Sequence, residues 1–173
     1  MMLSAGLSES LNTNEELLSK LIYDVKEIFS TMVGISDLQY LPIQVDPVTQ
    51  FQDCISSMVG LAGTYNGLVS LHMSSDLAVK TASDMLGLEV SEVNGDVNFA
   101  LGEITNMIAG SFKNHISKGG LDVHLSIPTV IYGKEYIFML RNKPDQIAVR
   151  FAKDDDWFIV AVDYGKTYLT ANK

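Results

Sequence analysis

Two eight-residue segments of this chain match each other without a gap, and the match constrains the fold. Residues 27–34 read Glu-Ile-Phe-Ser-Thr-Met-Val-Gly, and residues 103–110 read Glu-Ile-Thr-Asn-Met-Ile-Ala-Gly. Each segment lies in a stretch whose apolar residues recur at helical spacing, and each stretch is followed by three runs typical of strands. The sequence therefore predicts a unit of one helix and three strands that occurs twice.

Periodicity and turn residues give the predicted elements. The first long helix is expected to begin at a cap on Asn14 and to end at Gly34, and the second is expected to cover about 97–118, before Gly119-Gly120. A short helix is expected over 75–86. The predicted strands are 38–45, 51–62, 68–73, 123–132, 146–152 and 157–162. Asn66-Gly67 predicts the hairpin turn before the third strand.

This order of elements predicts an α+β fold with pseudo-two-fold symmetry. Two long helices are expected to pack on a mostly antiparallel sheet of about six strands. Residues 1–173 are expected to form a single domain, with halves at about 14–73 and 94–163 and a flexible segment at 1–12.

Composition excludes several classes of function. The chain has 12 basic and 21 acidic residues and a net charge of −9, which disfavours binding to nucleic acid or to an anionic membrane surface. No segment has the roughly 18 consecutive apolar residues that membrane insertion needs. The single cysteine, Cys54, allows no internal disulfide, and the first twelve residues lack the pattern of a signal peptide. We therefore expect a cytoplasmic protein.

The second long helix has one apolar and one mixed face. At about 100° per residue, its apolar stripe faces the sheet, and the opposite stripe faces solvent. The apolar stripe contains Leu101, Ile104, Ile108, Phe112 and Ile116, and the opposite stripe contains Phe99, Glu103, Asn106, Gly110 and Lys113. Glu103 and Asn106 are three residues apart, so both can reach the same partner.

These residues resemble the CheX/CheC/FliY family of chemotaxis phosphatases. The resemblance rests on Glu103-x-x-Asn106, on the flanking residues 100–102 and 107–110, and on Pro128, which 21 intervening residues separate from Asn106 and which lies at the head of a predicted strand. It extends over about residues 14–165 and includes the repeat of a helix and three strands.

The resemblance implies hydrolysis of the phosphoaspartate of a CheY-like response regulator. Asn106 would orient the attacking water and Glu103 would contact the regulator, which would carry the Mg²⁺, since the chain needs no cofactor of its own. Phe99, Gly110 and Lys113 would complete the partner-binding face. Glu27 and Ser30 would form a degenerate second site, which favours the homodimeric CheX type.

One position departs from the family pattern and keeps alternatives open. Phe99 stands where the family usually has Asp or Ser, so activity is in question. The first alternative is a non-catalytic module of the same fold that docks a response regulator or a flagellar switch component. The second is a structural dimer in which the helix faces bury Glu103 and Asn106.

Other chemically capable residues form no recognisable motif. His72, His115 and His124 lack metal-binding spacing, so a structural role is expected for all three. The acidic run 154–156 is expected to be a solvated hairpin turn, and Cys54 is expected to be a small buried residue.

Overall fold

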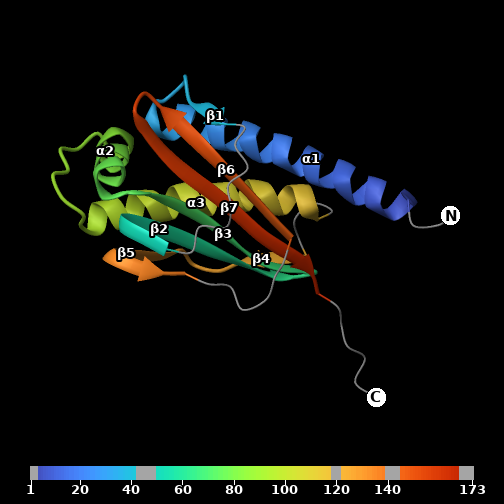
Figure 1. Cartoon of the computed structure of the whole chain (residues 1–173). Coiled ribbons are helices and arrows are strands. Elements are labelled where there is room, and N and C mark those ends of the chain that lie inside the picture. Colours follow the sequence, from blue (N-terminus) through green and yellow to red (C-terminus); the bar gives the residue numbers. More distant parts are fainter. Residues whose placement is uncertain (1–3, 42–49, 118–121, 139–144, 168–173) are drawn as a thin grey trace, which may run out of the picture.

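Two long helices, α1 and α3, lie side by side on one face of an antiparallel sheet (Figure 1). The computed structural model describes residues 4–41, 50–117, 122–138 and 145–167. The helices are α1 (Ser4–Ile28), which continues as the π-helical turn η1 (Phe29–Val33), α2 (Ser75–Leu86) and α3 (Gly95–Ile116). The strands are β1 (Gln39–Leu41), β2 (Gln50–Gly63), β3 (Tyr65–Ser74), β4 (Val123–Leu125), β5 (Thr129–Ile137), β6 (Asp145–Lys153) and β7 (Asp156–Lys166).

The strand order interleaves the strands of the two halves of the chain in one sheet. The order is β1-β6-β7-β3-β2-β4, and β5 also pairs with β2, beside β4. Strands β3 and β7 therefore meet at the centre, and the first strand of each half pairs with the second strand of the other. This arrangement confirms the predicted α+β fold, with seven strands rather than six because the predicted strand 123–132 is interrupted before Thr129.

The predicted hairpin turn at Asn66-Gly67 is wrong. Both residues belong to β3, where Asn66 is opposite Gly165 and Gly67 is opposite Tyr164 of β7. The turn lies at Thr64, and the Asn66 side chain accepts a hydrogen bond from the amide of Gly63. The local signal for a turn was outweighed by pairing of β3 with a strand nearly a hundred residues away in the sequence.

The two long helices begin at other residues than predicted. Helix α1 begins at Ser4, so Asn14 is not its cap; its side chain instead accepts a hydrogen bond from the Tyr164 hydroxyl. Helix α3 begins at Gly95, and Asn94 caps it by accepting hydrogen bonds from the amides of Asp96 and Val97. Gly34 ends the first helix in a left-handed conformation, as predicted. Gly119-Gly120 and residues 42–45 of the first predicted strand lie outside the described residues.

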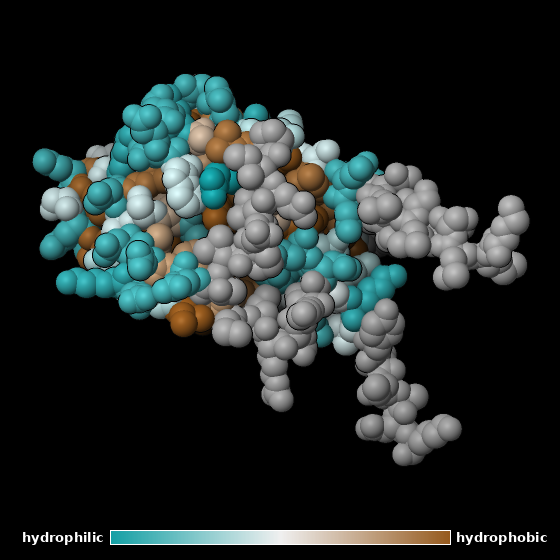
Figure 2. Space-filling model, viewed as in Figure 1, coloured by the Kyte–Doolittle hydropathy of each residue, from teal (hydrophilic) through white to brown (hydrophobic). Residues whose placement is uncertain are grey.

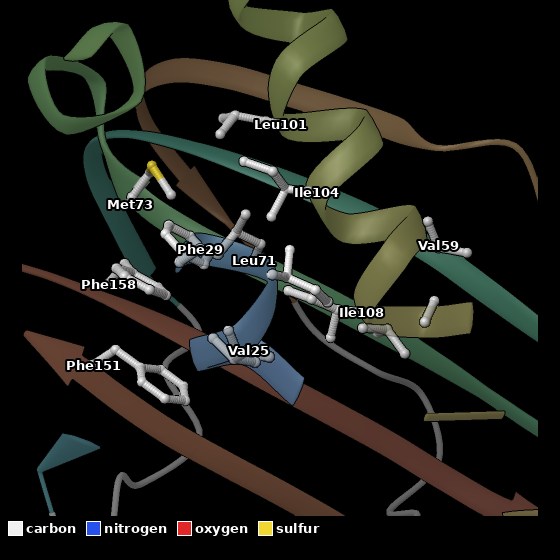
Figure 3. Packing of buried hydrophobic residues seen from close by; sticks show 14 of the residues in the cluster. Val25, Phe29, Val59, Leu71, Met73, Leu101, Ile104, Ile108, Phe151 and Phe158 are labelled. Carbon is white, nitrogen blue, oxygen red and sulfur yellow. The ribbon is translucent and has the colours of Figure 1, made fainter. Parts of the chain in front are cut away.

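The core lies between the helices and the sheet (Figure 3). Val25 and Phe29 from the first helix meet Leu101, Ile104 and Ile108 from α3, above the inward-facing residues of the strands. The Phe29 ring stacks on Phe158, which in turn stacks on Phe151. The predicted apolar stripe of α3 is thus confirmed, with Leu101, Ile104, Ile108 and Phe112 fully buried.

The surface mixes hydrophobic and hydrophilic residues. In the view of Figure 2, brown hydrophobic atoms reach the surface at several places between teal hydrophilic ones. None of the helices in the described ranges is long and apolar enough to cross a membrane.

Candidate functional site

The outward face of α3 carries the predicted polar pair. Glu103 and Asn106 are both partly exposed, and Phe99, one turn before Glu103, has 58% of its surface exposed. Among the side chains described in residues 14–41, 50–117, 122–138 and 145–167, neither Glu103 nor Asn106 takes part in an ion pair or a side-chain hydrogen bond. Their polar atoms are therefore available to a partner.

Contacts on its buried face and with helix α1 hold helix α3 in place. Thr105, between the two polar residues, is fully buried, and its hydroxyl donates to the carbonyl of Leu101. Nearer the helix end, Nε2 of His115 lies 2.6 Å from a carboxylate oxygen of Asp24 in α1. The polar pair thus projects from a rigid element, which limits the entropy lost when a partner binds.

Pro128 lies directly beside the polar pair. A Cβ atom added to Gly102 would lie 3.3 Å from Cβ of Pro128, so the helix and the start of β5 touch at this glycine. Pro128, whose spacing from Asn106 carried the family resemblance, therefore contacts α3 at the residue before Glu103. Sequence reasoning gave no reason for Gly102, although a glycine in a helix interior was a signal of close approach.

The other predicted contact residues differ in their surroundings. Gly110 is partly exposed, and the space where its side chain would be is open. Lys113 is partly buried, and its ammonium group lies 3.4 Å from the carbonyl of Val123. Phe99 and Gly110 therefore present a free surface, whereas the cation of Lys113 already has a partner within the chain.

The two matching octets occupy different places along their helices. Gly34 ends the first helix, and Ser30 lies within the π-helical turn that precedes it. Gly110, in contrast, lies inside α3, which continues to Ile116. Glu27 is exposed and Ser30 partly exposed. Their role as a degenerate second site stays a prediction, and this difference in position weighs against it.

A second polar cluster lies on the sheet face that the helices do not cover. The Ser56 hydroxyl lies 2.6 Å from Nδ1 of His72 and 2.6 Å from the Tyr136 hydroxyl, and the Ser70 hydroxyl lies 2.9 Å from Nε2 of His72. The Phe51 ring stacks on the imidazole with 4.5 Å between centroids. His72 also contributes to the wall of an open groove of about 590 Å³. Both ring nitrogens are hydrogen-bonded, which supports the structural role predicted for this histidine.

Burial of His72 makes the stability of the fold depend on pH. It lowers the pKa of the imidazole from 6.5 to about 4, so the unfolded chain takes up a proton before the folded chain does. The stabilisation is complete above about pH 6.5 and is lost as the pH falls towards 4. We expect the free energy of unfolding to fall by about 2 kcal/mol between about pH 7 and pH 5, measured by urea titration.

The His72→Gln variant is the control for this pH dependence, because an amide keeps hydrogen-bonding capacity but does not titrate. Burial also raises the pKa of Asp163, which acts in the opposite sense as the pH falls. That contribution is common to both proteins and cancels in their difference. Equal slopes for wild type and His72→Gln between pH 7 and 5 would contradict the assignment.

Comparison with known proteins gives the same family for sequence and structure. The family model for the chemotaxis phosphatase CheX matches residues 55–152, which include Glu103, Asn106 and Pro128. The CheY-P phosphatase CheX of Thermotoga maritima is 27% identical over 120 residues, which cover 69% of this chain and 77% of that protein.

Two solved structures share the fold over most of their length. Chemotaxis protein CheX from Desulfovibrio desulfuricans is 27% identical with a TM-score of 0.72, and the match covers 87% of this chain and 99% of that one. CheX of Borrelia burgdorferi, solved with CheY, BeF₃ and Mg²⁺, is 21% identical with a TM-score of 0.69, and the match covers 86% and 97%. Because the family model matches more than half of its residues, the chain belongs to the CheX family of chemotaxis phosphatases.

Proposed function

We propose that this protein dephosphorylates a CheY-like response regulator by hydrolysing its phosphoaspartate. The observation that carries the proposal is the pair Glu103 and Asn106, which projects from a rigid helix beside Pro128 with no other side chain bonded to it in the described part of the chain. The CheX relative of Thermotoga maritima, a CheY-P phosphatase, supports the same activity.

Asn106 is proposed to position the attacking water. Phosphoryl transfer depends on placing the nucleophile in line with the leaving group and on neutralising charge, more than on covalent chemistry by the catalyst. The carboxamide can donate one hydrogen bond and accept another, so it can hold a water molecule without a change in its own charge. Because helical side chains lean towards the N-terminus, the amide lies over the turn of Gly102 and Glu103.

Glu103 is proposed to set the register of the complex. Its carboxylate is one turn of helix from Asn106 and would pair with a cation beside the regulator's phosphorylation site. An exposed ion pair contributes about 0–1 kcal/mol, so this contact gives direction more than affinity. Affinity is then expected from apolar contact, for which Phe99 is exposed on the same face.

Further parts of the proposal concern the wider assembly. The Mg²⁺ is assigned to the regulator, and the protein is placed in the cytoplasm with that partner. A homodimer stays a prediction. Edge strand β5 carries the exposed side chains of Ile131 and Tyr132, and such an edge can pair with a second chain.

A second candidate function is docking without catalysis, which the exposure of Phe99 favours. The two are separated by phosphate release from a CheY-type receiver protein of the same organism, phosphorylated with acetyl phosphate. Acceleration of release by the wild-type protein supports the phosphatase. Stable binding of the phosphorylated regulator with no acceleration supports the docking module instead.

A further inference from the structure

An isoleucine beside the polar pair is almost fully exposed although its backbone is held firmly. Ile127 has 86% of its surface exposed, more than any other large apolar side chain among the described residues. It lies in the short segment between β4 and β5, where pairing with β2 is interrupted. A single exposed apolar side chain is common on a protein surface, but this one is next to Pro128, which contacts the helix that carries the polar pair.

The backbone around Ile127 is fixed on both sides. On one side, the amide of Ser126 donates to the carbonyl of Gly60, and the Ser126 hydroxyl accepts from the amide of Gly60. The same hydroxyl lies 3.0 Å from the carbonyl of Ile127. On the other side, Pro128 has a fixed backbone angle and packs on Gly102 of α3. The backbone that carries the isoleucine is therefore held in place before any partner arrives.

The segment also lies within the reach of any partner that covers Asn106. Gly102 is one helical turn from Asn106 and touches Pro128, the neighbour of Ile127. The path from Asn106 to Ile127 through these residues is about 15 Å long at ordinary backbone spacings. A protein interface of standard size covers about 800 Å² on each partner, a disc roughly 16 Å in radius. A partner centred on Asn106 can therefore also reach Ile127.

We propose that Ile127 is an apolar anchor for the response regulator, which it contacts beside the polar pair. This inference rests on the proposed function and adds a residue that determines affinity for the partner. The regulator is expected to present an apolar surface next to its phosphorylation site. Because the Ser126–Pro128 backbone is already ordered, little backbone entropy is lost when Ile127 is covered.

The test is the kinetics of the Ile127→Ser variant with the phosphorylated CheY-type receiver protein of the same organism. Loss of a buried isoleucine contact is expected to raise KM about tenfold, while kcat stays within about twofold. The matched control is Ile137→Ser, which replaces an equally apolar side chain, 68% exposed, at the far end of β5. The control is expected to keep the wild-type KM and kcat, and both variants the wild-type melting temperature.

Several outcomes separate this inference from the proposed function. An unchanged KM in Ile127→Ser, or an equal rise in Ile137→Ser, overturns the anchor while the activity of the wild type still supports the phosphatase. If the wild type releases no phosphate, the proposed function fails, and the anchor is tested by its affinity for the regulator bound to beryllium fluoride and Mg²⁺. A tenfold loss of this affinity in Ile127→Ser then supports the anchor. No binding of the regulator by the wild type overturns the anchor. If sedimentation showed that Ile127→Ser, and not the control, loses a dimer present in the wild type, Ile127 would be a dimer contact and the anchor would be overturned.

Discussion

Replacement of Asn106 by alanine is expected to lower kcat for dephosphorylation by about 10²–10³-fold, the usual cost of removing one hydrogen-bonding group that acts in the transition state. The side chain is partly exposed and makes no side-chain hydrogen bond with another described residue, so the substitution removes no contact that holds the fold. Alanine also favours helix more than asparagine does. The melting temperature is therefore expected to stay the same or to rise slightly.

The measurement is phosphate release at saturating phosphorylated regulator, with thermal unfolding of the same samples. Asn114→Ala is the matched control, because Asn114 lies exposed on the same helix two turns further on and is not proposed to hold the attacking water. It is expected to keep the wild-type kcat. An Asn106→Ala variant with wild-type turnover would show that the amide does not hold the water, and a similar loss in Asn114→Ala would indicate a general effect on α3.

The position of the polar pair could be predicted because it depends on local periodicity. Helix α3 buries one continuous stripe, so the exposure of Glu103 and Asn106 follows from the spacing of Leu101, Ile104 and Ile108. Helix α2 was predicted for a similar reason: Ser74 caps it through the amide of Leu77, and Gly87 ends it. Each of these signals lies within a few residues of the structure that it specifies.

Features that depend on distant pairing could not be predicted. Asn66-Gly67 has the composition of a hairpin turn, but β7 supplies partners for both residues and extends β3 through them. The segment around Ile127 resembles a continuous strand, yet Pro128 packs on Gly102 and breaks the pairing with β2. In both cases the deciding contact comes from a segment far away in the sequence, which no local pattern records.

Gly67→Ala is expected to be among the most destabilising small substitutions in the chain. Gly67 lies in β3 between two neighbours, opposite Leu61 of β2 and Tyr164 of β7. An added Cβ atom would lie 2.0 Å from the carbonyl oxygen of Asp163 and 2.9 Å from Cα of Tyr164. Both are backbone atoms of the central strand pair, so no rotation of a side chain can relieve the overlap, and β3 must move away from β7.

We expect the free energy of unfolding of Gly67→Ala to fall by about 3 kcal/mol, at the upper end of the usual cost of overpacking. This corresponds to a decrease of about 6–12 °C in melting temperature for a chain of this size. Urea titration checks the value, with an unchanged m-value as evidence that both proteins unfold from the same compact state.

Gly110→Ala is the matched control, because the same substitution there is expected to have the opposite sign. Gly110 lies inside α3, and nothing stands within 4 Å of its added Cβ atom. Alanine in a helix interior is favoured over glycine by about 0.5–1 kcal/mol, so this variant is expected to be more stable than the wild type. If Gly67→Ala were as stable as the wild type, the register that places Gly67 opposite Tyr164 would be wrong. A slip of one residue in that register cannot rescue the variant. It would turn every inward side chain of β3 away from α3, and the free energy lost with these core contacts would exceed the free energy gained by removing the overlap at residue 67.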